Sequence, residues 1–148
     1  MLTNKAKYGL KAMLYLADHV AEGGVRGADI AAAEHIPKKF LDAILITLRD
    51  HGFVAAKKGV RGGYQLARPA DRITVGEMVR LLDGPLAPIP CVSKTAYRPC
   101  PDCPDEAACR VRRLMADVRE ALSGILDNAT LADLQGRAER ERILDFVI

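Results

Sequence analysis

The sequence lacks the features that would place the protein in a membrane or among the common enzyme classes. It has no run of about 18 apolar residues, so it predicts no transmembrane helix. Lysines interrupt the apolar residues of the opening stretch MLTNKAKYGLKAMLYLA, which favours an amphipathic helix over a signal peptide. A glycine-rich phosphate loop and a paired-acid constellation are both missing. We therefore expect a cytoplasmic protein that contacts no membrane.

Cysteine is absent outside one stretch, where all four cysteines follow the pattern C-x8-C-x2-C-x5-C: Cys91, Cys100, Cys103 and Cys109. Thiolates are soft ligands that suit iron–sulfur clusters, zinc or copper(I). Prolines at 99, 101 and 104 surround the central pair and predict an ordered loop rather than a helix. This pattern favours an iron–sulfur cluster of the 2Fe–2S or 4Fe–4S type, and it favours zinc less. Disulfides and a metal-free thiol switch remain open alternatives.

A catalytic cysteine would need a histidine base and an oriented third group. The three histidines, His19, His35 and His51, lie in the N-terminal third, far in sequence from every cysteine. We therefore expect no catalytic residues, no small-molecule substrate and no enzymatic activity.

Positive charge is concentrated in the first half of the chain. Residues 1–72 hold 12 lysines and arginines against 7 acids, whereas residues 73–148 hold 10 against 12. A basic half suggests a polyanionic partner such as nucleic acid.

Helical periodicity in this basic half predicts a helix-turn-helix. Helices are expected over residues 4–21, 27–34 and from Pro37 to about Asp50, with the short connection His35-Ile36-Pro37 between the last two. The expected apolar faces are Leu10, Met13, Leu14, Ala17 and Val20 in the first helix, and Phe40, Leu41, Ile44, Leu45 and Leu48 in the third.

A basic hairpin is expected next, with strands 53–56 and 64–66 around the glycine-rich tip KKGVRGG. From Gly52 to Ala70 the sequence has no acid, so the hairpin reads as a wing that lays Lys57, Lys58 and Arg61 against DNA. The alternative is a hairpin whose charged tip is only solvated. At the start of the third helix, Lys38 and Lys39 sit where the helix dipole disfavours cations, which points to an external anion.

Phe40 and Asp42 are expected to lie on the same exposed start of the third helix. Asp42 either accepts a hydrogen bond from cytosine N4 or offsets the lysines.

The second half begins with a capping box, Thr74 and Glu77, that predicts a helix over 75–83. A proline-rich link leads into the cysteines. From about Pro104 to Asp127 we expect one long helix, whose apolar stripe predicts a two-fold dimer through Val111, Leu114, Val118, Leu122 and Ile125. Thr130 is expected to cap a short helix ending near Gly136, and the tail RAERERILDFVI carries no assignment.

These segments resemble the Rrf-two family of bacterial winged-helix regulators over essentially the whole chain. The most specific matches are Leu41-Asp42, the wing RGGYQLAR and the helix TVGEMV. The resemblance implies a mainly α fold: a winged helix-turn-helix DNA-binding domain (1–83), a cysteine-rich sensor loop (84–104), and a dimerisation helix and tail (105–148). It also implies a homodimer on double-stranded promoter DNA.

In cluster-binding members of that family, three cysteines lie between the helix after the wing and the dimerisation helix, which Cys91, Cys103 and Cys109 match best. Cys100 is additional, and Lys7 stands where the nitric-oxide sensors carry an acidic ligand. An all-cysteine site is therefore the interpretation that fits this sequence. The function implied is a transcriptional regulator, expected to be a repressor, whose DNA affinity depends on an iron–sulfur cluster. A metal-free thiol-sensing or partner-sensing regulator, and a zinc-stapled one, are the alternatives.

Overall fold

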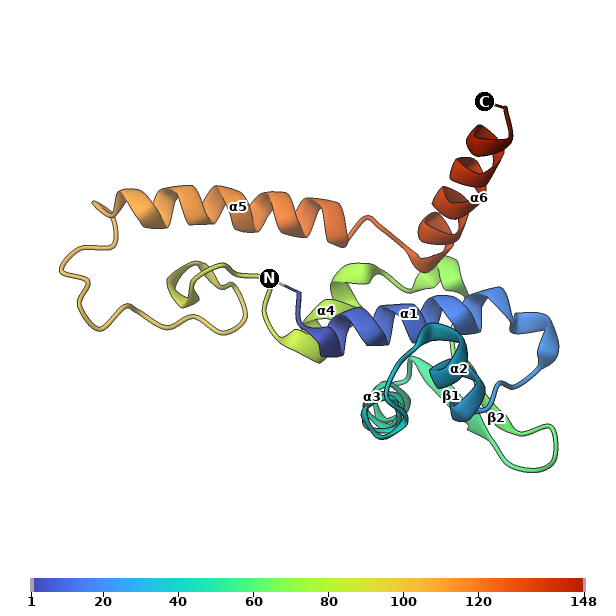
Figure 1. The fold of residues 1–148 in the computed structure, drawn as a ribbon. Helices are drawn as coiled ribbons and strands as arrows, with labels where there is room; N and C mark the ends of the chain where they lie inside the picture. The colour runs from blue at the N-terminus through green and yellow to red at the C-terminus, as the bar shows by residue number, and fades with distance from the viewer. Residues whose placement is uncertain (1, 148) are drawn as a thin grey trace.

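The computed structural model describes residues 2–147, and it is mainly helical (Figure 1). Six α-helices and one two-stranded sheet make up the described chain: α1 (Asn4–Asp18), α2 (Gly27–Glu34), α3 (Lys38–Asp50), β1 (Val54–Lys57), β2 (Gly63–Leu66), α4 (Val75–Asp83), α5 (Arg110–Leu126) and α6 (Leu131–Val147). The mainly α winged-helix class expected from the sequence is confirmed.

The hydrophobic core lies between α1, α2, α3 and α4, because the apolar faces of these helices converge. Leu41, Ile44, Leu45 and Leu48 of α3 are all buried, as predicted. Leu10 and Leu14 of α1 are half-buried against this core. Two residues of the predicted apolar faces are exposed: Phe40 at 44% and Val20 at 64%. Val20 leaves the core because α1 ends at Asp18 and the chain turns through the short 3-10 helix η1 (Val20–Glu22).

The helix starts follow the local capping signals. The side chain of Thr3 accepts a hydrogen bond from the backbone of Ala6 at the start of α1. Thr74 and Glu77 form the predicted capping box, in which each side chain bonds the other residue's backbone N–H. Such a cap is worth about 1 kcal/mol. The predicted bounds of α4 are those observed, and so are those of α2, which begins without a side-chain cap.

The hairpin pairs β1 with β2 in antiparallel register, from Val54 opposite Leu66 to Lys57 opposite Gly63. Tyr64 also forms a bridge with Val25, which ties the hairpin to the segment between α1 and α2. Tyr64 is packed against the core, as expected for a hairpin residue.

The second half departs from the prediction at both of its helices. The long helix α5 begins at Arg110 rather than near Pro104, because residues 104–109 form turns and Cys109 is the N-cap. The last helix does not stop near Gly136: α6 runs through the unassigned tail to Val147. Thr130 does cap it, since its hydroxyl accepts from the backbone of Asp133.

Helix α6 returns to the first half of the chain. Leu131 is fully buried in the same core as α1 and α3, and its N–H donates to the carbonyl of Ile73. The core is thus completed by a residue from the C-terminal segment. In Figure 1, α3 and the hairpin lie on one side of α1, and α5 and α6 lie on the other.

Candidate DNA-binding surface and cysteine segment

The start of α3 is exposed, as a DNA-reading helix requires. A left-handed residue, His35 (φ 54°), ends α2 and allows the tight turn into α3. Lys38 Nζ donates to both carboxylate oxygens of Asp42, at 2.9 Å each. In this structure Asp42 therefore offsets Lys38, whereas Lys39 makes no ion pair within residues 2–147.

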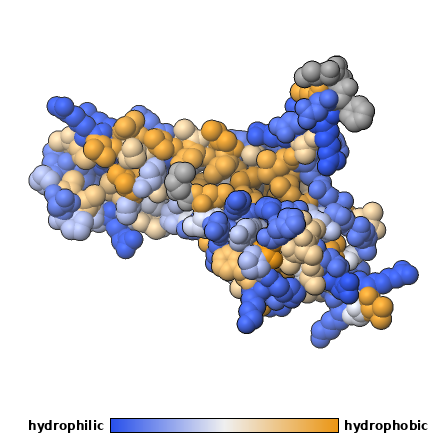
Figure 2. All heavy atoms as spheres, viewed as in Figure 1, coloured by the Kyte–Doolittle hydropathy of each residue, from blue (hydrophilic) through white to orange (hydrophobic). Residues whose placement is uncertain are grey.

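The tip of the hairpin carries the second group of cations. Lys57, Lys58 and Arg61 are exposed, and none of them makes an ion pair with another described residue. In Figure 2 hydrophilic side chains project from this tip at the lower right. A Cβ at Gly62 would come within 2.5 Å of the carbonyl oxygen of Lys57, so the turn requires glycine there. The tip can therefore present three free cations on one compact loop.

Arg68 is basic but belongs to the fold rather than to the tip. Its guanidinium lies 4.7 Å from the centre of the Phe53 ring, and it pairs with Glu77 at 3.4 Å. Arg68 lies in the same acid-free stretch as the tip cations, from Gly52 to Ala70, and its partners separate it from them.

The cysteine segment, residues 91–109, contains no disulfide, and its four thiols differ in burial. Cys91 is buried at 4% exposure, whereas Cys100, Cys103 and Cys109 are half-buried. The pKa of the Cys100 thiol is raised above its ordinary value, first by desolvation and then by the neighbouring Cys91, with smaller effects of Asp102 and Cys103.

These thiols fit a soft metal or cluster in their chemistry but are not gathered around one point. Among the described residues, no three His, Cys, Asp or Glu side chains come close enough together to hold a metal ion. Four thiols on one short segment are nevertheless a donor set for zinc or iron–sulfur ligation. The predicted ligand set Cys91, Cys100, Cys103 and Cys109 stays a prediction.

Both ends of the cysteine segment are attached to α5. At the far end, the sulfur of Cys109 accepts a hydrogen bond from the backbone N–H of Arg112, 3.4 Å away. At the near end, the guanidinium of Arg119 donates to the carbonyl oxygen of Val92, directly after Cys91. The Arg119 contact was missed from the sequence, because the two residues are 27 positions apart and nothing local marks the pair.

A third connection links α5 to the first half of the chain. The guanidinium of Arg80 in α4 binds the carboxylate of Asp127 at the end of α5 through both of its terminal nitrogens. This pair lowers the pKa of Asp127 below its ordinary value, chiefly through the hydrogen bond. The cysteine segment, α5 and α4 thus form a continuous chain of contacts.

Helix α5 buries none of its residues within the single chain. The predicted dimer residues Val111, Leu114, Leu122 and Ile125 are 38–65% exposed, and Val118 is half-buried. In Figure 2 hydrophobic side chains gather over α5. An apolar stripe of this length on a protein surface marks an interaction site.

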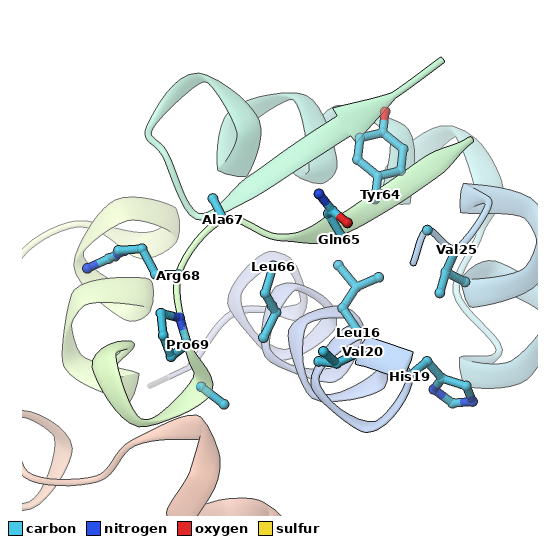
Figure 3. A pocket seen from close by; sticks show the side chains of 12 residues that line it. Leu16, His19, Val20, Val25, Tyr64, Gln65, Leu66, Ala67, Arg68 and Pro69 are labelled. Atoms are coloured by element: carbon cyan, nitrogen blue, oxygen red, sulfur yellow. The ribbon is translucent and has the colours of Figure 1, made fainter. Parts of the chain in front are cut away.

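The cleft beside the end of α1 does not have the composition of an active site. It has a volume of about 380 Å³ and lies between the end of α1 and the strand and loop at residues 64–70 (Figure 3). Leu16, Val20 and Leu66 make its lining mainly apolar, and it contains no serine, cysteine or carboxylate side chain. Its one histidine, His19, is stacked on Tyr15 and hydrogen-bonded to the Tyr15 carbonyl.

A family model described as iron-dependent transcriptional regulator, Rrf2, matches residues 2–137. The chain belongs to the Rrf2 family. An Rrf2-like helix-turn-helix regulator of Rhodobacter capsulatus is 44% identical over 137 residues, covering 90% of this chain and 91% of its own. The regulator CymR of Bacillus subtilis is 30% identical over 141 residues, covering 95% and 94%.

Solved structures of Rrf2 proteins agree with this assignment. CymR of B. subtilis, a global cysteine regulator, superposes with a TM-score of 0.77 at 31% identity, covering 93% of this chain and 97% of its own. IscR of T. potens superposes with a TM-score of 0.76 at 28% identity, covering 95% and 90%.

This Rrf2 chain is therefore a DNA-binding transcriptional regulator and not an enzyme, as the sequence predicted. None of the described helices is long and apolar enough to span a bilayer.

Proposed function

We propose that the chain is a homodimeric repressor whose affinity for promoter DNA is set by an iron–sulfur cluster on Cys91, Cys100, Cys103 and Cys109. The observation that carries the proposal is the attachment of the cysteine segment to α5 at both ends. A change in the positions of the cysteines would act on α5, and through Arg80 and Asp127 on α4.

The unpaired cations support the DNA contacts. Lys39 at the start of α3 and Lys57, Lys58 and Arg61 at the hairpin tip are exposed and free of acidic partners in the described chain. Each cation that neutralises a phosphate releases a counterion, which favours binding. Lys38, Phe40 and Asp42 complete the proposed surface, with Lys38 and Asp42 able to exchange their mutual ion pair for contacts with DNA.

The exposed stripe of α5 supports the dimer. A second copy of α5 would cover Val111, Leu114, Val118, Leu122 and Ile125 and place two α3 helices on one duplex. Half-sites on DNA must be spaced by about one helical turn, so a shift of one α3 relative to the other weakens specific binding. The dimer therefore converts a small movement of α5 into a change of affinity.

The donor set and the family support the cluster. The matching family model is described as iron-dependent, and four thiols lie within one short segment. An iron–sulfur cluster, when bound, supplies a group whose presence depends on iron and whose charge depends on redox state. The cysteines would hold it as thiolates, and the burial of Cys91 would exclude water from one side.

A second candidate is a metal-free regulator that senses thiol state or a protein partner. The four free thiols of the cysteine segment favour it, because thiols can respond to oxidation without a metal. Structures similar to this chain include CymR of Staphylococcus aureus in an oxidised form, with a TM-score of 0.67 at 27% identity, covering 90% of this chain and 94% of its own.

The test is an anaerobic absorption spectrum with iron, sulfide and zinc analysis, on wild type and on each of the four cysteine-to-alanine variants. We expect a coloured protein with thiolate-to-iron bands, an iron content per chain that distinguishes a 2Fe–2S from a 4Fe–4S cluster, and loss of iron in each variant. A colourless protein containing zinc would indicate that the cysteine segment is a structural zinc site. A colourless, metal-free protein would favour the thiol-sensing candidate.

A further inference from the structure

An aromatic contact joins the first turn of α1 to the start of α3. The rings of Tyr8 and Phe40 meet edge to face, with centroids 5.7 Å apart and planes at 88°. Lys5 precedes Tyr8 by three residues, so their side chains are neighbours on one face of α1. Lys39 precedes Phe40 in α3. The aromatic pair therefore has a lysine beside each of its two members.

Ion pairing divides the cations of the basic half into two groups. One group is bound to acids of the same chain: Lys11, Arg26, Lys38, Arg49 and Arg68. The second group has no such partner within residues 2–147: Lys5, Lys7, Lys39, Arg72 and the three hairpin-tip cations. A phosphate can pair with a cation of the second group without displacing a carboxylate, so these cations are the favourable contacts for DNA.

Freedom from ion pairing alone does not identify a DNA contact. Arg72 is also exposed and unpaired in the described chain, but it lies in the 3-10 helix η2 (Ala70–Arg72), which packs against α6. Helix α6 lies across α1 from α3 and the hairpin (Figure 1). Lys5 differs from Arg72 because the contact of Tyr8 with Phe40 connects its part of α1 to the reading helix.

We propose that the DNA-binding surface extends to the first turn of α1 and that Lys5 contacts a backbone phosphate beside the groove entered by α3. The proposal rests on the proposed DNA-binding surface and adds a sequence-independent contact to it. Tyr8 and Phe40 hold the two helices together, so Lys5 and Lys39 engage the duplex as one unit.

The test compares wild type with Lys5→Gln, Lys39→Gln and Arg72→Gln by fluorescence anisotropy on a random-sequence duplex at several salt concentrations. Affinity falls with salt, and each lost phosphate contact reduces the magnitude of the slope of log affinity against log salt by about 0.9, or by about twice that for a dimer. We expect Lys5→Gln and Lys39→Gln to reduce this magnitude and Arg72→Gln to leave it at the wild-type value. Lys5→Arg should restore it, because the charge returns.

An unchanged slope for Lys5→Gln, together with a lowered slope for Lys39→Gln, would overturn this inference and leave the proposed DNA surface standing. Unchanged slopes for both variants would overturn the surface as well. Circular dichroism of each variant checks that the helices are retained. Lys5 is half-buried on α1 and makes no ion pair with another described residue, so its replacement by glutamine removes no such pair.

Discussion

The two halves of the molecule are held together in different ways. From α1 to α4 the chain buries a continuous core, which Leu131 of α6 completes. From residue 84 to the end of α5, only Cys91, Val92 and Ser93 are buried. The first half can form its core within one chain, whereas the second exposes the apolar face of α5 and four thiols. The proposed dimer and cluster would cover α5 and bind the thiols, whereas the first half needs no such partner to bury its core.

The largest effect is expected from a charge placed in the apolar stripe of α5. We expect Leu122→Glu to weaken the dimer at least about 30-fold, because two copies of an unpaired carboxylate would enter the interface at about 1–3 kcal/mol each. Sedimentation equilibrium measures the change. Val60→Glu is the control, because Val60 is fully exposed at the hairpin tip and lies outside α5. A wild-type protein that is already monomeric would contradict the account of α5.

The first half should respond instead as a single packed core. Leu45 is fully buried in α3, so Leu45→Ala removes packing and leaves a cavity. We expect the free energy of unfolding to fall by about 2–5 kcal/mol. Urea denaturation followed by circular dichroism measures it, and a loss below the effect of an exposed substitution such as Val60→Ala would argue against the core described.

Substitutions at two glycines test the contact between α4 and the end of α5. A Cβ at Gly76 would lie 2.0 Å from the carboxylate of Asp127, whereas a Cβ at Gly124 in α5 would meet open space. We expect Gly76→Ala to destabilise the fold by about 1–3 kcal/mol. Gly124→Ala should stabilise α5 by up to about 1 kcal/mol, because alanine favours a helix. Thermal unfolding of both variants should therefore shift in opposite directions, and equal shifts would count against the contact.

The smallest effect concerns acid stability at the same junction. The pKa of Asp127 is lowered by its hydrogen bonds to Arg80, and the pKa of Glu77 is lowered chiefly by the backbone of Thr74. A lowered folded-state pKa contributes stability above the ordinary value, which is lost as pH falls through the folded pKa. Because both groups are partly exposed, each contributes at most about 1 kcal/mol. Asp127→Asn should lose stability at pH 7 and show a weaker decline toward pH 3 than wild type, in thermal melts at both values.

The sequence was most informative where structure is local. Thr74 with Glu77 defined α4, and the glycine-rich tip defined the hairpin, because caps and turns depend on residues a few positions apart. The start of α5 was placed too early, because Asp105 and Glu106 after Pro104 resemble a first helical turn. In the structure Asp105 accepts from the backbone of Ala107, and Glu106 accepts from the hydroxyl of Tyr97.

Contacts between distant segments could not be predicted. Arg80 and Asp127 are 47 positions apart, and Arg119 reaches a backbone carbonyl that carries no sequence signature. The tail after Gly136 lacks an apolar stripe, so its helix in α6 gave no periodic signal. The ligand set of the cysteine segment likewise depends on where four thiols come together, which their spacing alone does not determine.

The most direct test of the central claim compares DNA affinity with and without iron. Protein isolated without oxygen would first select a duplex from a random-sequence pool. Its affinity would then be measured, under anaerobic conditions, before and after iron removal, alongside Cys91→Ala. The account predicts an affinity change of at least about tenfold on iron removal, within the usual range for coupled sites, and no such change in Cys91→Ala. Equal affinities of the iron-loaded and iron-free wild-type protein would contradict it.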